Sequence, residues 1–501
     1  MAYDRSSSEV NLDLDLSRDP SARDESRRVD EVTVRLAICG DFSAGASSGA
    51  SSGASSGASS GASAAAHGSA GAWRIDRDDF DDVLARVAPT LHLDLGSGVV
   101  AEVRIRELDD FHPDRLLERV PQFATLRELR ARLADPATFR RTAAELSVRQ
   151  APAQARPVAP PSGSLLDSIV GMETPQSTAS GGPDDALYDF IQRAMAPYLV
   201  DRPDPRQDVM IAEADASIAS VMRLLLHHPQ FQALESLWRG MYRAVREIDT
   251  SAQLQVHLVN FGRDALLADL ATAPSARETQ LYERLATLAP SEQGGWGILV
   301  AHCSFGGSTD DIAMLGRLAE VGSALDAPWL AEAHPDIALG SLSDEAAKAW
   351  TYLRSRPAAH HLGLALPRVL LRLPYGKETD PCEHFDFEEL ENADAHNSYL
   401  WGNPAVICAT LLARGFSERG PGLMVGSSSA IGGLPLHLVR RGGETVAKPC
   451  AEVLMREDDA TALIDAGFIP MISYRDQDVV RVGRMQSIAN PATRLAGRLG
   501  G

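Results

Sequence analysis

A tandem repeat interrupts this chain directly after its first strand-like segment. An apolar run over residues 32–38 ends at the string CGDFS, and four Gly-Ala-Ser-Ser units then extend from Gly45 to Ser60. Gly and Ser bury too little apolar surface to offset the entropy lost on ordering, so the repeat predicts a flexible tether. Globular sequence resumes at Trp73. The fold must therefore accept a long connection over residues 44–72, and a surface loop does so because its closure entropy grows slowly with length.

Length and charge limit the class of protein. With 501 residues the chain is too long for one ordinary core, so two or three domains are expected. Its 68 acidic residues outnumber its 48 basic ones, which argues against a nucleic-acid partner, whose phosphates require clustered Lys and Arg. No stretch reaches the roughly 18 consecutive apolar residues of a spanning helix, and the polar N-terminus resembles no secretory signal. We therefore expect no insertion into a membrane.

The cysteines indicate a reducing compartment. All five are scattered, and no Cys-x-x-Cys pair occurs among them. Their number and spacing support neither a zinc site nor a disulfide framework. The sequence therefore predicts a cytoplasmic location, with no metal and no cofactor.

The N-terminal part of the chain reads as an arm followed by a small domain. Residues 1–28 are charged and poor in aromatic residues, which is typical of a disordered arm. The first globular domain is predicted over residues 29–139, interrupted by the tether. Its predicted elements are strands over residues 32–38, 91–95 and 99–108 and helices over residues 79–88 and 113–133.

A second linker is predicted over residues 140–185, where the string APAQARPVAPPSGS is rich in Pro and Ala. Within it, a short amphipathic helix is predicted over residues 164–171. Its apolar positions are Leu165, Leu166, Ile169 and Val170. A helix this short is marginal in water unless it docks on a surface. That surface is either its own domain or an apolar groove on a partner protein.

The second globular domain is predicted over residues 186–488, followed by a tail at 489–501. Apolar strand-like runs alternate with helical stretches in this region, which favours an α/β (α+β) fold with a mixed sheet covered by helices. The predicted strands cover residues 254–259, 296–302, 329–333, 362–365 and 434–439. The predicted helices cover residues 215–228, 231–247, 263–270, 311–325, 344–355 and 403–413.

Histidines occur in three motifs that invite a metal interpretation. They are His112-Pro113, His227-His228-Pro229 and His360-His361. Adjacent residues on a helix point about 100° apart, and no acid or cysteine stands near the paired histidines at ligand spacing. We therefore favour a structural role over metal binding for the paired histidines, and a place at a helix start over catalysis for His112.

Two further clusters have a structural and a functional interpretation. Aromatic residues stand beside glycines at Trp238 and at residues 399–402, and packing in a core is favoured over a stacking platform for bases. The acidic run over residues 378–394 lacks the EF-hand pattern, so a solvated face is favoured, with a basic patch on a neighbouring protomer as an alternative contact. No nucleophile, base and oxyanion donors can be combined, so the sequence predicts no catalytic residues and no enzyme.

Long strings on both sides of the second linker resemble a known family. LAICGDFSAG and the strings that begin at Trp73 and Arg104 are similar to the small subunit of the contractile sheath in bacterial type VI secretion systems. Five strings of the second domain resemble the large subunit of the same sheath: residues 224–245, 360–376, 384–390, 399–416 and 463–488. The resemblance covers most of residues 32–139 and 164–488. It also implies a capping and packing role at a helix end for His227 and His228.

The resemblance implies a structural protomer in which a small subunit is fused to a large one. Such protomers stack around an inner tube and contract to drive secretion. The implied partners are other sheath subunits, the inner tube protein, baseplate components and the AAA+ ATPase that disassembles contracted sheaths. Large sheath subunits carry an N-terminal helix that this ATPase recognises, so the resemblance makes Leu165, Leu166, Ile169 and Val170 its candidate binding residues.

One departure from the family leaves an alternative open. The family's large subunit continues well past the segment that ends here at residue 488, whereas this sequence stops at Gly501. The continuation helps to build the sheath wall in the family. A non-polymerising adaptor or regulator derived from the sheath is therefore the alternative function.

Overall fold

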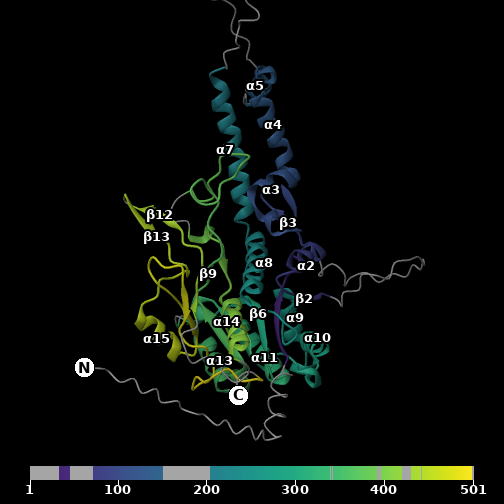
Figure 1. Ribbon diagram of the computed structural model, residues 1–501, viewed down its shortest axis with the longest axis vertical. Coiled ribbons are helices and arrows are strands. Elements are labelled where there is room, and N and C mark those ends of the chain that lie inside the picture. Colours follow the sequence, from purple (N-terminus) through teal and green to yellow (C-terminus); the bar gives the residue numbers. More distant parts are fainter. Residues whose placement is uncertain are drawn as a thin grey trace, which may run out of the picture. The chain divides into compact units, whose positions relative to one another are not determined.

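The structure is a computed structural model that describes residues 33–45, 71–150, 204–419 and 430–498, apart from residues 97, 339, 341, 392–395 and 442 (Figure 1). The chain divides into two compact units. Unit 1 combines residues up to Val120 with residues from Val221 onward, and unit 2 covers Pro121–Ser220.

A nine-stranded mixed sheet forms the centre of unit 1, as the predicted fold class requires. Its strand order is β11-β15-β14-β8-β7-β6-β1-β5-β2. The six strands from β14 to β5 run parallel, whereas β2, β15 and β11 pair antiparallel at the edges. The strands are β1 (Val34–Gly40), β2 (Ala72–Ile75), β5 (Leu254–Asn260), β6 (Ile298–Phe305), β7 (Trp329–Ala333), β8 (Leu362–Leu366), β11 (Ala430–Ile431), β14 (Ile469–Ser473) and β15 (Val480–Val482).

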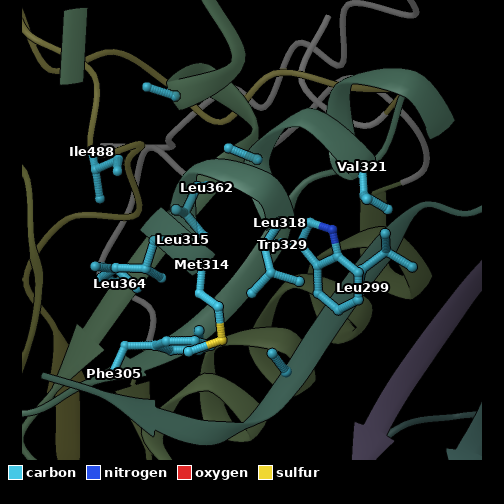
Figure 2. Packing of buried hydrophobic residues seen from close by; sticks show 14 of the residues in the cluster. Leu299, Phe305, Met314, Leu315, Leu318, Val321, Trp329, Leu362, Leu364 and Ile488 are labelled. Carbon is cyan, nitrogen blue, oxygen red and sulfur yellow. The ribbon is translucent and has the colours of Figure 1, made fainter. Parts of the chain in front are cut away.

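Helices cover both faces of this sheet, which explains why its central strands are continuous apolar runs. One face carries α9 (Arg263–Thr272), α10 (Gln280–Leu288), α11 (Thr309–Leu325) and α13 (Asp344–Ser355). Figure 2 shows this core, where Leu299 and Trp329 of the strands lie beside Leu318 and Val321 of α11. The other face carries α8 (Pro229–Glu247) and α14 (Pro404–Arg419), which pack on each other, and α14 also contacts β6, β7 and β8.

Smaller elements complete unit 1. A hairpin of β3 (Thr90–Asp94) and β4 (Val100–Arg104) lies between the helix α2 (Phe80–Val87) and the helix α3 (Pro113–Arg119), which a 3-10 turn at Leu108–Phe111 precedes. Two more antiparallel pairs join β9 (Val369–Leu370) to β10 (Trp401–Gly402) and β12 (Leu438–Arg441) to β13 (Glu444–Ala447). The remaining helices are α12 (Pro335–Ala338) and α15 (Glu457–Asp465).

Unit 2 is a small helical unit. It contains α4 (Ala124–Ala134), α5 (Pro136–Gln150) and most of α7 (Arg206–Leu226). Its apolar core consists of Leu133, Phe139, Ala143 and Ala214. The side-chain amide of Gln207 donates hydrogen bonds to the carbonyl oxygens of Leu133 and Ala134, at 2.9 and 3.1 Å. These bonds satisfy carbonyls at the C-terminal end of α4 that have no partner within the helix.

Most predicted elements are confirmed within a few residues. The helix predicted over residues 215–228 begins earlier, at Arg206, and the strand predicted over residues 99–108 ends at Arg104. Two other predictions are wrong. The helix predicted over residues 113–133 is broken, because α3 ends at Arg119 and the backbone of Val120 is extended (φ −81°, ψ 119°). Pro121 is the cause, since proline lacks an N–H and forces the preceding residue out of the helical region. The strand predicted over residues 434–439 begins only at Leu438, and Pro435 cannot donate to a strand ladder.

Other predictions are changed or left untested. Helix α5 was not predicted, and it continues to Gln150 through the start of the segment predicted as a linker. The predicted arm at 1–28, the tandem repeat and the amphipathic helix at 164–171 lie outside the described residues. Among the helices that the structure describes, none is long and apolar enough to cross a membrane.

Candidate functional site

Strand β1 joins two distant parts of the chain. It lies between β5 and β6, with Val34 opposite Leu254, Gly40 opposite Asn260 and Leu36 opposite Ile298. Its side chains at residues 36–38 are fully buried. We call the contacts between residues 33–120 and residues 221–498 the joint; both segments belong to unit 1. Because β1 is hydrogen-bonded on both sides, the second segment's sheet is incomplete without the first segment.

The loop after β1 is fixed by a close approach and two hydrogen bonds. A Cβ atom on Gly40 would lie 3.2 Å from a Leu237 methyl group and 3.3 Å from the His302 Cβ, which leaves little room for a side chain. The Ser43 N–H donates to Asn260 Oδ1 at 3.3 Å, and Asn260 Nδ2 donates to the Ser43 hydroxyl at 2.8 Å. These contacts hold residues 40–43 in place at the end of β1, before the repeat begins.

Aromatic side chains from both segments meet on α8. Trp238 and Tyr242 stand one turn apart on that helix. The Phe42 ring lies 5.4 Å from the Trp238 ring, and the Phe80 ring lies 5.9 Å from Trp238 and 5.2 Å from Tyr242, all edge-to-face. This geometry suits the aromatic quadrupoles. Trp238 is fully buried, so the packing interpretation of its cluster is confirmed.

Two His-Pro motifs begin helices, as the sequence analysis favoured. His112 Nδ1 accepts the Asp114 N–H at 3.2 Å at the start of α3, and His228 Nδ1 accepts the Gln230 N–H at 3.3 Å at the start of α8. Each cap satisfies one of the backbone donors that a helix start leaves open, and proline follows where its missing N–H costs nothing. His360 Nδ1 instead lies 2.7 Å from the Thr493 hydroxyl.

Arginine and glutamate side chains of the second segment form a buried ion network that contacts the first segment. Arg372 Nε donates to Glu235 Oε1 and Arg372 Nη1 donates to Glu389 Oε2, both at 2.7 Å. Arg239 also donates to Glu235 Oε1 at 2.7 Å, and to the Tyr375 hydroxyl at 3.0 Å. The Tyr375 hydroxyl then donates to the Phe111 carbonyl oxygen at 3.4 Å. The network therefore reaches from the second segment to the first.

The acidic run over residues 378–394 is not entirely a solvated face. Phe385, Phe387 and Glu389 are buried, whereas Asp386 and Glu388 between them are exposed. The solvated-face interpretation is therefore wrong for Glu389. The alternation of HFDFEEL was a signal for this arrangement, since period-two patterns place alternate residues on one face.

Electrostatics hold Glu389 in its charged form. Burial alone would raise the pKa of Glu389, but the Arg372 charge, the nearby His227 and the Tyr375 N–H outweigh it and lower the pKa to about 2. Glu235 is likewise flanked by Arg372 and Arg239. Both carboxylates are engaged by guanidinium groups, so this arrangement suits rigidity rather than proton transfer.

The stability of unit 1 is expected to fall as the pH drops from about 4.3, the value for an unfolded Glu, toward about 2, the pKa of Glu389 in the fold. Because the folded pKa is the lower one, the unfolded chain binds the proton more tightly in this window. The contribution of Glu389 to the stability of unit 1 is complete above the pKa of the unfolded state and disappears as the pH approaches the pKa of the folded state. Urea midpoints across the window should drop more steeply for the wild type than for Glu389→Gln; equal slopes would contradict this assignment.

The residues predicted to bind the disassembly ATPase are not placed by the structure. Leu165, Leu166, Ile169 and Val170 lie outside the described residues. The joint was not foreseen from the sequence, because its partners are well over 100 residues apart along the chain.

Both segments of the joint contain regions that match known protein families. Residues 208–489 match the VipB family model, described as EvpB/VC_A0108, tail sheath N-terminal domain. Residues 62–146 match the model described as Type VI secretion system, VipA, VC_A0107 or Hcp2. The type VI secretion system sheath protein TssC1 of Pseudomonas aeruginosa is 29% identical over 305 residues, which is 56% of this chain and 61% of that relative. The chain thus spans less than two thirds of that relative's length. It belongs to the type VI secretion system tail sheath family, with the small-subunit and large-subunit domains fused in one polypeptide.

Proposed function

We propose that this chain is a structural protomer of a type VI-like contractile sheath, which assembles in the cytoplasm around an inner tube and contracts to drive secretion. One observation carries the proposal. Strand β2, inside the region that matches the small subunit, pairs with β5, inside the region that matches the large subunit. One sheet of this chain thus contains strands from two regions that match two separate family models.

The proposed work is mechanical. A subunit that repeats one head-to-tail contact builds a helical tube, and contraction requires that contact to have two stable arrangements. The partners in this proposal are further copies of the chain or other sheath subunits, the inner tube protein and baseplate components. The sheath descriptions and the ion-paired carboxylates of the buried network around Arg372 both support a structural rather than a catalytic role.

The test is negative-stain electron microscopy of the full chain, alone and with its cognate inner-tube protein, with the inner-tube protein alone as control. Regular hollow cylinders that appear only when the chain is present would support the proposal, and sedimentation should then show large polymers. Small particles under both conditions would contradict polymerisation. That result would favour a non-polymerising adaptor or regulator.

The same proposal assigns the segment at Leu165, Leu166, Ile169 and Val170 to the disassembly AAA+ ATPase. The Leu166→Asp variant should lose at least about tenfold in affinity, since a carboxylate in an apolar groove is not solvated. Ser168→Asp is the matched control, because it adds the same charge at a polar position of the segment. Equal retention of both variants by the immobilised ATPase would remove this segment from the proposal.

A further inference from the structure

Four potential metal ligands from both segments gather at the start of α3. His112 and Asp114 come from the string HPD, and Cys382 and His384 come from the string CEH in the loop before Phe385. Ligand atoms of His112, Asp114 and Cys382 all lie within 4.8 Å of one another. His384 Nδ1 lies 3.2 Å from Asp114 Oδ1, so it stands beside the same group.

We propose that His112, Asp114, Cys382 and His384 form a zinc site that links the two segments of the joint. The site is independent of sheath assembly and goes beyond the proposed function. Sequence spacing did not reveal it, because the two strings are far apart in the chain and no Cys-x-x-Cys pair is involved.

The ligand set matches zinc better than other common metals. Zinc accepts imidazole nitrogen, thiolate sulfur and carboxylate oxygen together, and structural sites hold four such ligands in a tetrahedron. Metal–ligand bonds of about 2.0–2.3 Å place neighbouring ligand atoms about 3.3–3.8 Å apart. His384 Nδ1 and Asp114 Oδ1, at 3.2 Å, are already close to this separation. Calcium and magnesium are disfavoured because they prefer oxygen ligands.

Hydrogen bonds within the joint hold the ligands in place. Asp114 Oδ2 accepts the Glu383 N–H at 2.8 Å, and Asp114 Oδ1 accepts the His384 N–H at 3.2 Å. A carboxylate oxygen has two lone pairs, so each can accept a hydrogen bond and one can still bind a metal. His112 uses Nδ1 for the helix cap, and this leaves Nε2, which lies 3.8 Å from Asp380 Oδ1, for a cation.

The local charge favours a cation. Asp114, Asp380, Glu388 and Glu389 place negative charges around Cys382. The same negative charges attract a divalent ion, which deprotonates a thiol that it binds.

The test uses the full chain after treatment with a chelator and removal of that chelator. Isothermal titration with zinc should give one strong site per chain. Cobalt(II) in place of zinc should give a near-ultraviolet charge-transfer band that reports a thiolate ligand. Zinc should also raise the thermal midpoint of the wild type.

Two variants separate metal binding from folding. Cys382→Ser removes the thiolate, and His112→Asn removes the imidazole while asparagine still caps the helix. Each should weaken zinc binding by at least about tenfold, since even outer-shell changes cost about 10–100-fold. Cys303→Ser, at another half-buried cysteine, and His228→Asn, at the equivalent cap of α8, should bind zinc as the wild type does.

Three outcomes would overturn the proposal. They are the lack of a stoichiometric zinc site in the wild type, equal zinc affinity in Cys382→Ser, and a cobalt complex without the sulfur band. A folded Cys382→Ser protein that fails to bind zinc, together with a binding-competent Cys303→Ser protein, would support the site.

Discussion

Replacing Arg372 by Met should lower the free energy of unfolding of unit 1 by about 3–5 kcal/mol, because it leaves buried carboxylates without their counter-ion. Arg372 is 8% exposed, and its partners Glu235 and Glu389 are 0% and 1% exposed. Glu235 would remain paired with Arg239, so the main effect is that Glu389 loses its arginine counter-ion. Urea unfolding followed by tryptophan fluorescence measures the change, since Trp238, Trp296 and Trp329 are all buried in unit 1.

The control for this prediction is an exposed ion pair. Arg456 pairs with Asp459, and their side chains are 83% and 49% exposed, so Arg456→Met should leave the free energy of unfolding almost unchanged. Adding Glu389→Gln to Arg372→Met should recover part of the loss, since Glu235 keeps Arg239 and no buried carboxylate then remains without a counter-ion there. If Arg372→Met costs no more than Arg456→Met, the network does not carry the stability assigned to it.

Replacing Trp238 by Ala should cost about 3–5 kcal/mol, because it opens a large cavity where the two segments meet. Trp238 is fully buried and holds Phe42 and Phe80 of the first segment in edge-to-face contact. The loss should therefore appear in the stability of the whole joint. Thermal or urea unfolding of the purified chain, followed by circular dichroism, measures it.

The Trp238→Phe variant separates packing from hydrogen bonding. Among the described residues the Trp238 indole N–H has no hydrogen-bond partner, so phenylalanine removes a donor that contributes nothing. Its cost should thus be well below that of alanine, and the remaining loss reflects the smaller ring. Equal costs for the two variants would mean that the cavity argument is wrong.

Local patterns predicted much of the secondary structure. The apolar spacing of residues 231–247 predicted α8, and the apolar runs at residues 329–333 and 362–365 predicted β7 and β8. These signals are local, since a helix or strand shows its period within its own residues. Where they failed, a single residue was decisive, as at Pro121, which divides one predicted helix into α3 and α4.

The candidate sites were harder to predict than the elements. The helix-start role of His112 was recognised from the proline that follows it, because a cap is also a local feature, whereas that of His228 was implied by the resemblance to the sheath family. The zinc-binding role proposed for His112 was not recognised from the sequence, because Cys382 and His384 lie near His112 only in the folded chain. Glu389 was placed in a solvated run because its partner Arg372 was not known to face it.

The sequence by itself determined the α/β fold class, the membership in the sheath family and most helix and strand positions. Only the tertiary structure decided that β1 lies between β5 and β6, that Glu389 is buried against Arg372, and that HPD meets CEH. The physical reason is the range of the interactions. Periodicity and caps are fixed by neighbours along the chain, whereas strand order, ion pairing and ligand clusters depend on which distant segments bury their apolar faces together.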